Sequence, residues 1–88
     1  MKDFVCIGKV YTSIVRFYAR RRSAINSNIL VEPDMPFLLV DLASHEIATG
    51  VVVIQFEILL GEEMFSYSHS TRDLKGTLEQ FFNPIQGE

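Results

Sequence analysis

The chain has 88 residues, of which 48% are hydrophobic, and it carries a formal net charge of −3. This length supports one domain, residues 1–88, because a second domain would have too little core to fold alone. The apolar fraction is typical of a globular protein and excludes a disordered tail. A core this small leaves apolar surface exposed, which favours association with a partner or with a second copy.

Charge is unevenly distributed along the chain. Residues 1–31 carry six cations and one acid, a balance of +5, whereas residues 32–88 carry two cations and ten acids, a balance of −8. Such a division suits docking onto an oppositely charged surface or head-to-tail association. The alternative is that the two halves neutralise each other within the fold.

The chain has one cysteine, Cys6, which excludes an internal disulfide and a four-thiolate metal site and fits a reducing compartment. Asp3 lies where a signal peptide would carry cations before a long apolar stretch. The most apolar segment, residues 51–60, contains Gln55 and Glu57 and is too short and too polar to span a bilayer. We therefore expect a cytoplasmic protein with no membrane partner.

The N-terminal third predicts short β-strands. Residues 4–7 and 10–11 form a β-branched and aromatic run, with Gly8 as a bulge or close-approach point. Residues 14–20 alternate between two faces of a strand. One face holds Val15, Phe17 and Ala19, and the other holds Ile14, Arg16, Tyr18 and Arg20.

The middle of the chain alternates between loops and strands. Residues 23–28 are small and polar and predict a loop, and residues 29–31 predict a short strand. Residues 32–36 contain two prolines, which exclude regular structure. Residues 37–42 predict the next strand, and residues 43–50 predict a second loop.

The strongest strand signal covers residues 51–60. Its apolar face consists of Val52, Ile54, Phe56, Ile58 and Leu60. The pair Gly61-Glu62 predicts a tight hairpin turn into a strand over residues 64–69.

The C-terminal segment predicts a helix. Residues 77–80 match a capping box, which indicates a helix that begins near Thr77 or a kinked one that begins at Thr71. Asn83-Pro84 ends it. The helical apolar stripe consists of Leu74, Leu78, Phe81, Phe82 and Ile85. We expect one core that includes Ile54, Phe56, Ile58, Phe65, Leu78 and Phe81.

Five or six short strands and a terminal helix predict a mainly β fold. At this length a small, strongly bent barrel is the economical solution, because closure removes free strand edges. The order of residues 8–13, 36–41 and 59–63 resembles that of small SH3-like barrel proteins, notably short accessory proteins of tailed phages. That resemblance implies a binding or assembly role and no catalytic residues.

A second resemblance is to PilZ domains, which bind cyclic dinucleotides through an RxxxR pair and a later D/NxSxxG turn. Arg16 and Arg20 have the first spacing, and Asp41 and Ser44 begin the second. The chain departs from the pattern at Ile47, where the family has glycine, and this departure argues against the binding of a cyclic dinucleotide.

The residues expected to bind a partner lie in one basic segment: Arg16, Tyr18, Arg20, Arg21 and Arg22. Guanidinium groups bind carboxylates and phosphates, and an aromatic neighbour stacks on bases. Arg21 and Arg22 are expected at the strand end, reaching outward. The leading hypothesis is a non-enzymatic protein-interaction or assembly module, with nucleic-acid or nucleotide binding through this segment as the alternative.

No residue pattern indicates catalysis, a metal or a cofactor. Cys6 with His45 or His69 would supply a thiolate–imidazole pair or zinc ligands, but no close ligand pair or orienting motif accompanies them. Cys6 is instead expected to pack as a small hydrophobe in a strand. Glu62 and Glu63 are interpreted as a solvated hairpin tip.

Overall fold

The computed structural model describes residues 5–22 and 27–85. Within these ranges the chain forms seven β-strands and one α-helix, so the prediction of a mainly β fold with a C-terminal helix is confirmed. None of the described residues belongs to a helix that is long and apolar enough to cross a membrane. The elements are β1 (Val10–Thr12), β2 (Phe17–Arg21), β3 (Asn28–Val31), β4 (Phe37–Ala48), β5 (Val51–Leu60), β6 (Glu63–Thr71), α1 (Leu74–Phe81) and β7 (Asn83–Pro84).

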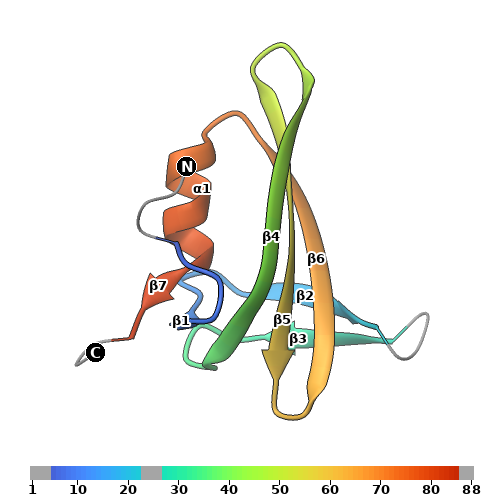
Figure 1. Cartoon of the computed structure of the whole chain (residues 1–88), viewed down its shortest axis with the longest axis vertical. Helices are drawn as coiled ribbons and strands as arrows, with labels where there is room; N and C mark the ends of the chain where they lie inside the picture. Colours follow the sequence, from blue (N-terminus) through green and yellow to red (C-terminus); the bar gives the residue numbers. More distant parts are fainter. Residues whose placement is uncertain (1–4, 23–26, 86–88) are drawn as a thin grey trace.

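The seven described strands form a single sheet in the order β3-β2-β6-β5-β4-β1-β7, and every pair is antiparallel. The long strands β4, β5 and β6 make a meander, and the β2–β3 hairpin crosses them at a steep angle (Figure 1). The sheet curls into a half-barrel, which is compatible with the predicted small barrel. The structure has one strand more than the five or six predicted, and this additional strand is β7, which follows the helix.

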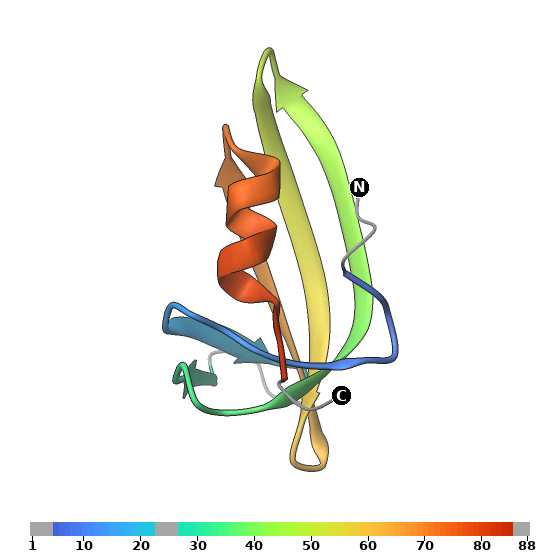
Figure 2. The same cartoon turned by 90° about the vertical axis from the view of Figure 1, so that its left-hand side faces the viewer.

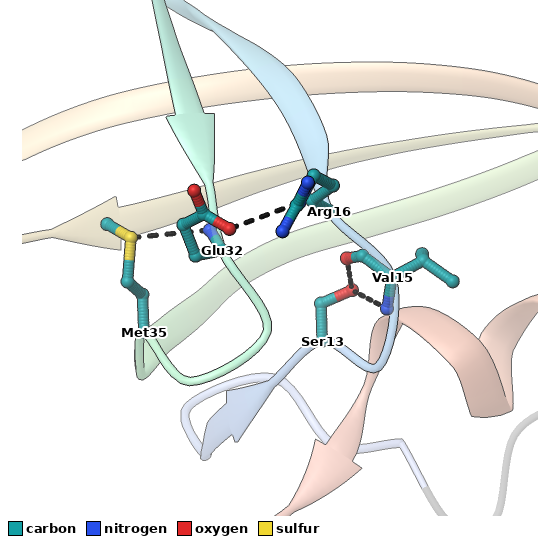
Figure 3. A network of polar contacts seen from close by, with 5 residues as sticks. All are labelled: Ser13, Val15, Arg16, Glu32 and Met35. Carbon is teal, nitrogen blue, oxygen red and sulfur yellow. Dashed lines mark hydrogen bonds and ion pairs between the residues drawn. The ribbon is translucent and has the colours of Figure 1, made fainter.

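The short connector between β1 and β2 explains the curl. The two strands are consecutive in the chain, but β4, β5 and β6 lie between them in the sheet. In a flat sheet they would be roughly 19 Å apart, about the reach of a fully extended connector over residues 13–16. This connector is bent, because the Ser13 hydroxyl accepts the Val15 N–H at 3.2 Å and donates to the Val15 carbonyl oxygen (Figure 3). The sheet must therefore curl to bring β1 and β2 within reach.

The helix packs against the inner face of the curled sheet and closes the core (Figure 2). Phe17 lies at the centre, with its ring centroid 4.9 Å from that of Tyr67 and 5.2 Å from that of Phe81. Such edge-to-face and tilted ring pairs add specific contacts to the area that the rings bury. All six side chains expected to share one core are buried in it: Ile54, Phe56, Ile58, Phe65, Leu78 and Phe81.

The predicted strand over residues 4–7 is wrong for its described part. Val5 is buried, but Cys6 and Ile7 are exposed and outside any strand. The Cys6 N–H donates to the Tyr11 hydroxyl at 2.7 Å, which requires the chain to turn back. Gly8 makes that turn with a positive φ of 93°, so it is a turn residue rather than a bulge.

The predicted loop over residues 43–50 is also wrong, because β4 continues to Ala48 and only a tight turn separates it from β5. Alanine, serine, histidine and glutamate have weak strand propensity, but each pairs with the strongly β-forming start of β5. Gly50 provides the turn with φ of 76°, and its N–H donates to the Glu46 carboxylate at 3.0 Å. The predicted hairpin turn at Gly61-Glu62 is confirmed.

The predicted capping box does not form. The N-cap of α1 is Asp73, whose Oδ1 accepts the Gly76 N–H at 3.1 Å. Thr77 lies inside the helix, buried, with its hydroxyl 2.7 Å from that of Thr71. The helix ends before Asn83-Pro84, as predicted. Of the predicted loop over residues 23–28, residues 23–26 lie outside the described residues, and Asn28 begins β3.

Candidate protein-interaction surface

The basic segment lies along β2, and its side chains divide between two faces. Arg16, Tyr18, Arg20 and Arg22 are exposed, whereas Phe17 and Ala19 are buried, so the predicted alternation is confirmed. The predicted strand over residues 14–20 is wrong at its start, because β2 begins at Phe17 and residues 14–16 belong to the bent connector. Tyr18 is the most exposed of the large apolar and aromatic side chains described, with 65% of its surface accessible. Arg21 follows Phe17 and Ala19 at the same two-residue spacing, so its side chain lies on the core side of the strand.

Three of the four arginines in the basic segment form ion pairs with glutamates from the acidic part of the chain. Arg16 Nε lies 3.1 Å from Glu32 Oε1, an ion pair that joins the start of β2 to the end of β3 (Figure 3). Arg22 Nη1 lies 3.1 Å from both carboxylate oxygens of Glu57. These pairs bring the two oppositely charged parts of the sequence together, so much of the charge separation is neutralised inside the domain.

Arg21 is held more tightly than the prediction of an outward-reaching side chain implies. Its Nη2 lies 3.1 Å from Glu63 Oε1, and its guanidinium carbon lies 5.6 Å from the ring centroid of Phe65. About a third of the side chain is accessible. Arg21 therefore contributes to the packing of β2 on β6, and the prediction that it reaches outward is wrong.

Arg20 differs from the other three because no carboxylate pairs with it among the described residues. It lies directly opposite Ser66 of β6 and Asn28 of β3 in the sheet register. Together with Tyr18 it lines an open hollow of about 330 Å³. The remaining residues of that hollow are Asn28, Ser66, Tyr67 and Ser68.

A second open hollow of about 250 Å³ adjoins the first, since both are lined by Ser66, Tyr67 and Ser68. Its other lining residues are Asp41, Ala43, Gln55, Phe56 and Glu57. We call the two hollows together the outer trough. The exposed positions that line it alternate along their strands with buried core residues, so the trough lies on the face of the sheet opposite α1.

The outer trough offers hydrogen-bonding groups rather than an acid–base or nucleophilic centre. It carries the hydroxyls of two serines and Tyr18, the amides of Asn28 and Gln55, and the guanidinium of Arg20. The Glu57 carboxylate is bound by Arg22, and Asp41 Oδ1 accepts the Leu42 N–H at 2.9 Å. Such an arrangement suits the binding of peptide groups and of one carboxylate.

The residues considered for thiolate or metal chemistry lie in different environments. Cys6 is exposed near the start of β1, and His45 is exposed on β4. His69 stacks on Tyr67, with its Nδ1 3.4 Å from the Tyr67 hydroxyl, and its ring is tilted against that of Phe81. Burial raises the pKa of Tyr67. In the described part of the chain, no three histidine, cysteine or acidic side chains are grouped as metal ligands would be.

Sequence reasoning found Tyr18 and Arg20 but missed the serines, Asn28 and Gln55. Ser66 and Ser68 alternate with buried residues on β6, which marks them as outward-facing. Their position beside Arg20 depends on β2 pairing with β6, a contact between segments about 45 residues apart that no local pattern indicates. No protein-family model, curated protein or solved structure matches the chain.

Proposed function

We propose that the chain is a non-enzymatic protein-interaction module, and that its partner binds in the outer trough at Tyr18 and Arg20. Tyrosine and arginine are the residue types that most often dominate the energy of protein interfaces. Arg20 is the observation that carries the proposal, because it is the arginine of the basic segment whose guanidinium no described carboxylate occupies. The serines and amides around it supply further hydrogen bonds to a partner backbone.

A protein partner is favoured over nucleic acid by the charges around the trough. A polyanion gains affinity from several unpaired cations along its path. Here Arg16, Arg21 and Arg22 are each paired with a glutamate, and the other end of the trough carries Asp41 and Glu57. A polypeptide with one acidic side chain matches this pattern better than a strand of phosphates.

Nucleic-acid or nucleotide binding remains the second candidate function because of one observation. Tyr18 and Arg20 are two positions apart on an exposed strand face, so an aromatic ring and a guanidinium group point the same way. A ring and a cation in that arrangement suit one base with its phosphate.

The resemblance to short accessory proteins of tailed phages fits the first candidate, as a structural or host-directed phage protein acting in the cytoplasm or the virion.

Titration of the isotope-labelled chain, followed by nuclear magnetic resonance, separates these candidates. The probes are a library of short peptides that each carry one aspartate or glutamate, and a single-stranded oligonucleotide, each at two salt concentrations. We expect peptides to shift the Tyr18 and Arg20 resonances. Arg20→Ser should weaken that binding about tenfold, since a hydrogen bond to a charged group contributes roughly 1.5–3 kcal/mol.

Arg16→Ser is the matched control, because Arg16 directly precedes β2 and is exposed, but it is paired with Glu32 and lies outside the trough. It should leave peptide binding unchanged. Tight oligonucleotide binding with a steep salt dependence would establish the second candidate instead. Peptide binding that is equal in Arg20→Ser and the parent chain would place the contact surface elsewhere.

A further inference from the structure

Among the residues that the structure describes, the distal half of β4 is a free edge of the sheet. β1 pairs with β4 at Phe37 and Leu38, and backbone bonds from Gly8 and Lys9 extend this contact only to Leu39. Beyond Leu39, the described residues pair with β4 on its β5 side alone. Here the β4–β5 hairpin projects past the end of α1, and residues 43–48 are exposed (Figure 1).

The backbone groups that face this edge follow from the hydrogen bonds. The Leu39 N–H and carbonyl oxygen bond to the β1 side, and a register shift lies between Leu39 and Asp41. The Leu42 N–H is bound by the Asp41 side chain and not by β5. Because orientation alternates along a strand, the N–H and carbonyl groups of Ser44 and Glu46 also point toward the open edge.

We propose that a second copy of this chain binds here, with the two β4 edges antiparallel about a two-fold axis at His45. This register places Ser44 opposite Glu46 of the other copy, twice, so that each pair exchanges two backbone hydrogen bonds. His45 lies opposite its own symmetry mate in the intervening position, where side chains are closest.

The sequence of the edge is complementary to itself in this register. The Glu46 carboxylate meets a serine hydroxyl, and Ile47, of which 57% is accessible, meets the small Ala43. Centring the pair on Ser44 instead would oppose Leu42 to Glu46 and Asp41 to Ile47, which desolvates two carboxylates against apolar groups. A register shift between Glu46 and Ala48 bends the strand and ends the pairing after Ile47.

This self-association does not rest on the proposed peptide binding, because it uses the strand edge and leaves Tyr18 and Arg20 uncovered; the two surfaces share Ala43, which lines the second hollow of the outer trough. Five residues on each side form a small interface, and small interfaces belong to weak, transient associations. We therefore expect a dimer that forms at high protein concentration and dissociates on dilution.

Opposite charges introduced on the axis test the register directly. His45→Glu and His45→Lys each place two like charges opposite each other in a homodimer, at roughly 5 Å between Cβ atoms, which is destabilising. By analytical ultracentrifugation at pH 8, the parent chain should associate with rising concentration, and each variant alone should remain monomeric. An equimolar mixture of the two variants should restore association, and native mass spectrometry should show the mixed dimer in excess over either homodimer.

Gln80→Glu and Gln80→Lys are the matched controls, because Gln80 is also exposed but lies on α1 and not on a strand edge. They should associate as the parent chain does, and circular dichroism should show every variant folded, since both positions are exposed. A parent chain that stays monomeric at about 1 mM, a concentration at which even weak dimers populate, overturns the proposal. The proposed β4–β4 register is overturned if either His45 variant associates on its own, or if the equimolar mixture of the two variants does not associate.

Discussion

Arg21 and Phe65 face each other across the junction of β2 and β6, with the guanidinium carbon of the one 5.6 Å from the ring centroid of the other. Glu63 holds the same guanidinium from the side. These contacts of Arg21 stabilise the packing of the β2–β3 hairpin on the meander. Arg21 therefore stabilises the fold, whereas its neighbour Arg20 is accessible to a partner.

The first prediction separates these two roles. Arg21→Ser should lower the free energy of unfolding by about 1 kcal/mol, because it removes a cation–ring contact, an ion pair and a packed aliphatic stem. Arg20→Ser should change it by less than about 0.5 kcal/mol, as is usual for an exposed side chain. Urea denaturation measures both values. Equal costs for the two substitutions would contradict the assignment.

The second prediction concerns the core. Phe56→Ala should cost roughly 3–5 kcal/mol of unfolding free energy, because the ring is 2% accessible and packs against Phe81 and Phe82. Gln55→Ala is the control, since that side chain is exposed on the same strand and should change stability little. A cost for Phe56→Ala well below about 1 kcal/mol would mean that the ring is not part of the core.

The third prediction concerns the start of α1. Asp73→Ala should lower stability by about 1 kcal/mol through loss of the N-cap. Gly76→Ala should give little gain in the parent chain, because a Cβ there would clash with Asp73 Oδ2 and displace the capping carboxylate. In the Asp73→Ala background the same change should stabilise by about 1 kcal/mol, the ordinary helix preference for alanine.

A double-mutant cycle by thermal denaturation measures this coupling. Additive effects of the two substitutions would show that the Asp73 carboxylate moves aside without losing its bond to the Gly76 N–H.

The fourth prediction concerns alkaline pH. Burial raises the pKa of Tyr67 above its ordinary value of 10.0, so folding favours the neutral phenol. Well below pH 10 the phenol is neutral in both states, and the full stability is present. As pH rises from there toward the folded-state pKa, the unfolded state releases the proton first and stability falls. Tyr67→Phe should therefore lose less stability than the parent chain between about pH 9 and pH 11, measured by urea denaturation.

The fifth prediction concerns Cys6. Its exposure outside any strand means that a thiol reagent should modify it fully in the native protein, as fast as it modifies the urea-unfolded chain. Spectrophotometric thiol titration makes the measurement. Protection in the native state would restore the original expectation of a packed cysteine in a strand.

Local patterns predicted most of the fold, because the alternation of buried and exposed residues along a strand can be recognised within that strand alone. The buried face of β5 and the two faces of β2 follow directly from period-two spacing, and so does the core membership of Ile54 and Phe56. The errors arose where a distant segment overrides local preference. Residues 43–48 become strand because β5 pairs with them, and Thr77 enters the helix because Asp73 caps it earlier.

The candidate site was predictable in its residue types but not in its state of pairing. A run of arginines indicates a basic surface, yet Glu32, Glu57 and Glu63 come from three other segments and neutralise most of it. Only the three-dimensional arrangement distinguishes Arg20 from its neighbours, because ion pairing depends on strand order and register.

The pairing of β1 with β7 also constrains how the domain is made. Tyr11 lies opposite Pro84, and Thr12 lies opposite Asn83, although more than 70 residues separate them in the chain. The meander of β4, β5 and β6 joins neighbours and can form early, whereas this last contact closes a long loop and is expected to form late. During synthesis the ribosome must deliver residue 84 before the sheet is complete. Until then the rings of Tyr11 and Phe37 lack their cover from Phe82, and apolar surface exposed during folding favours aggregation.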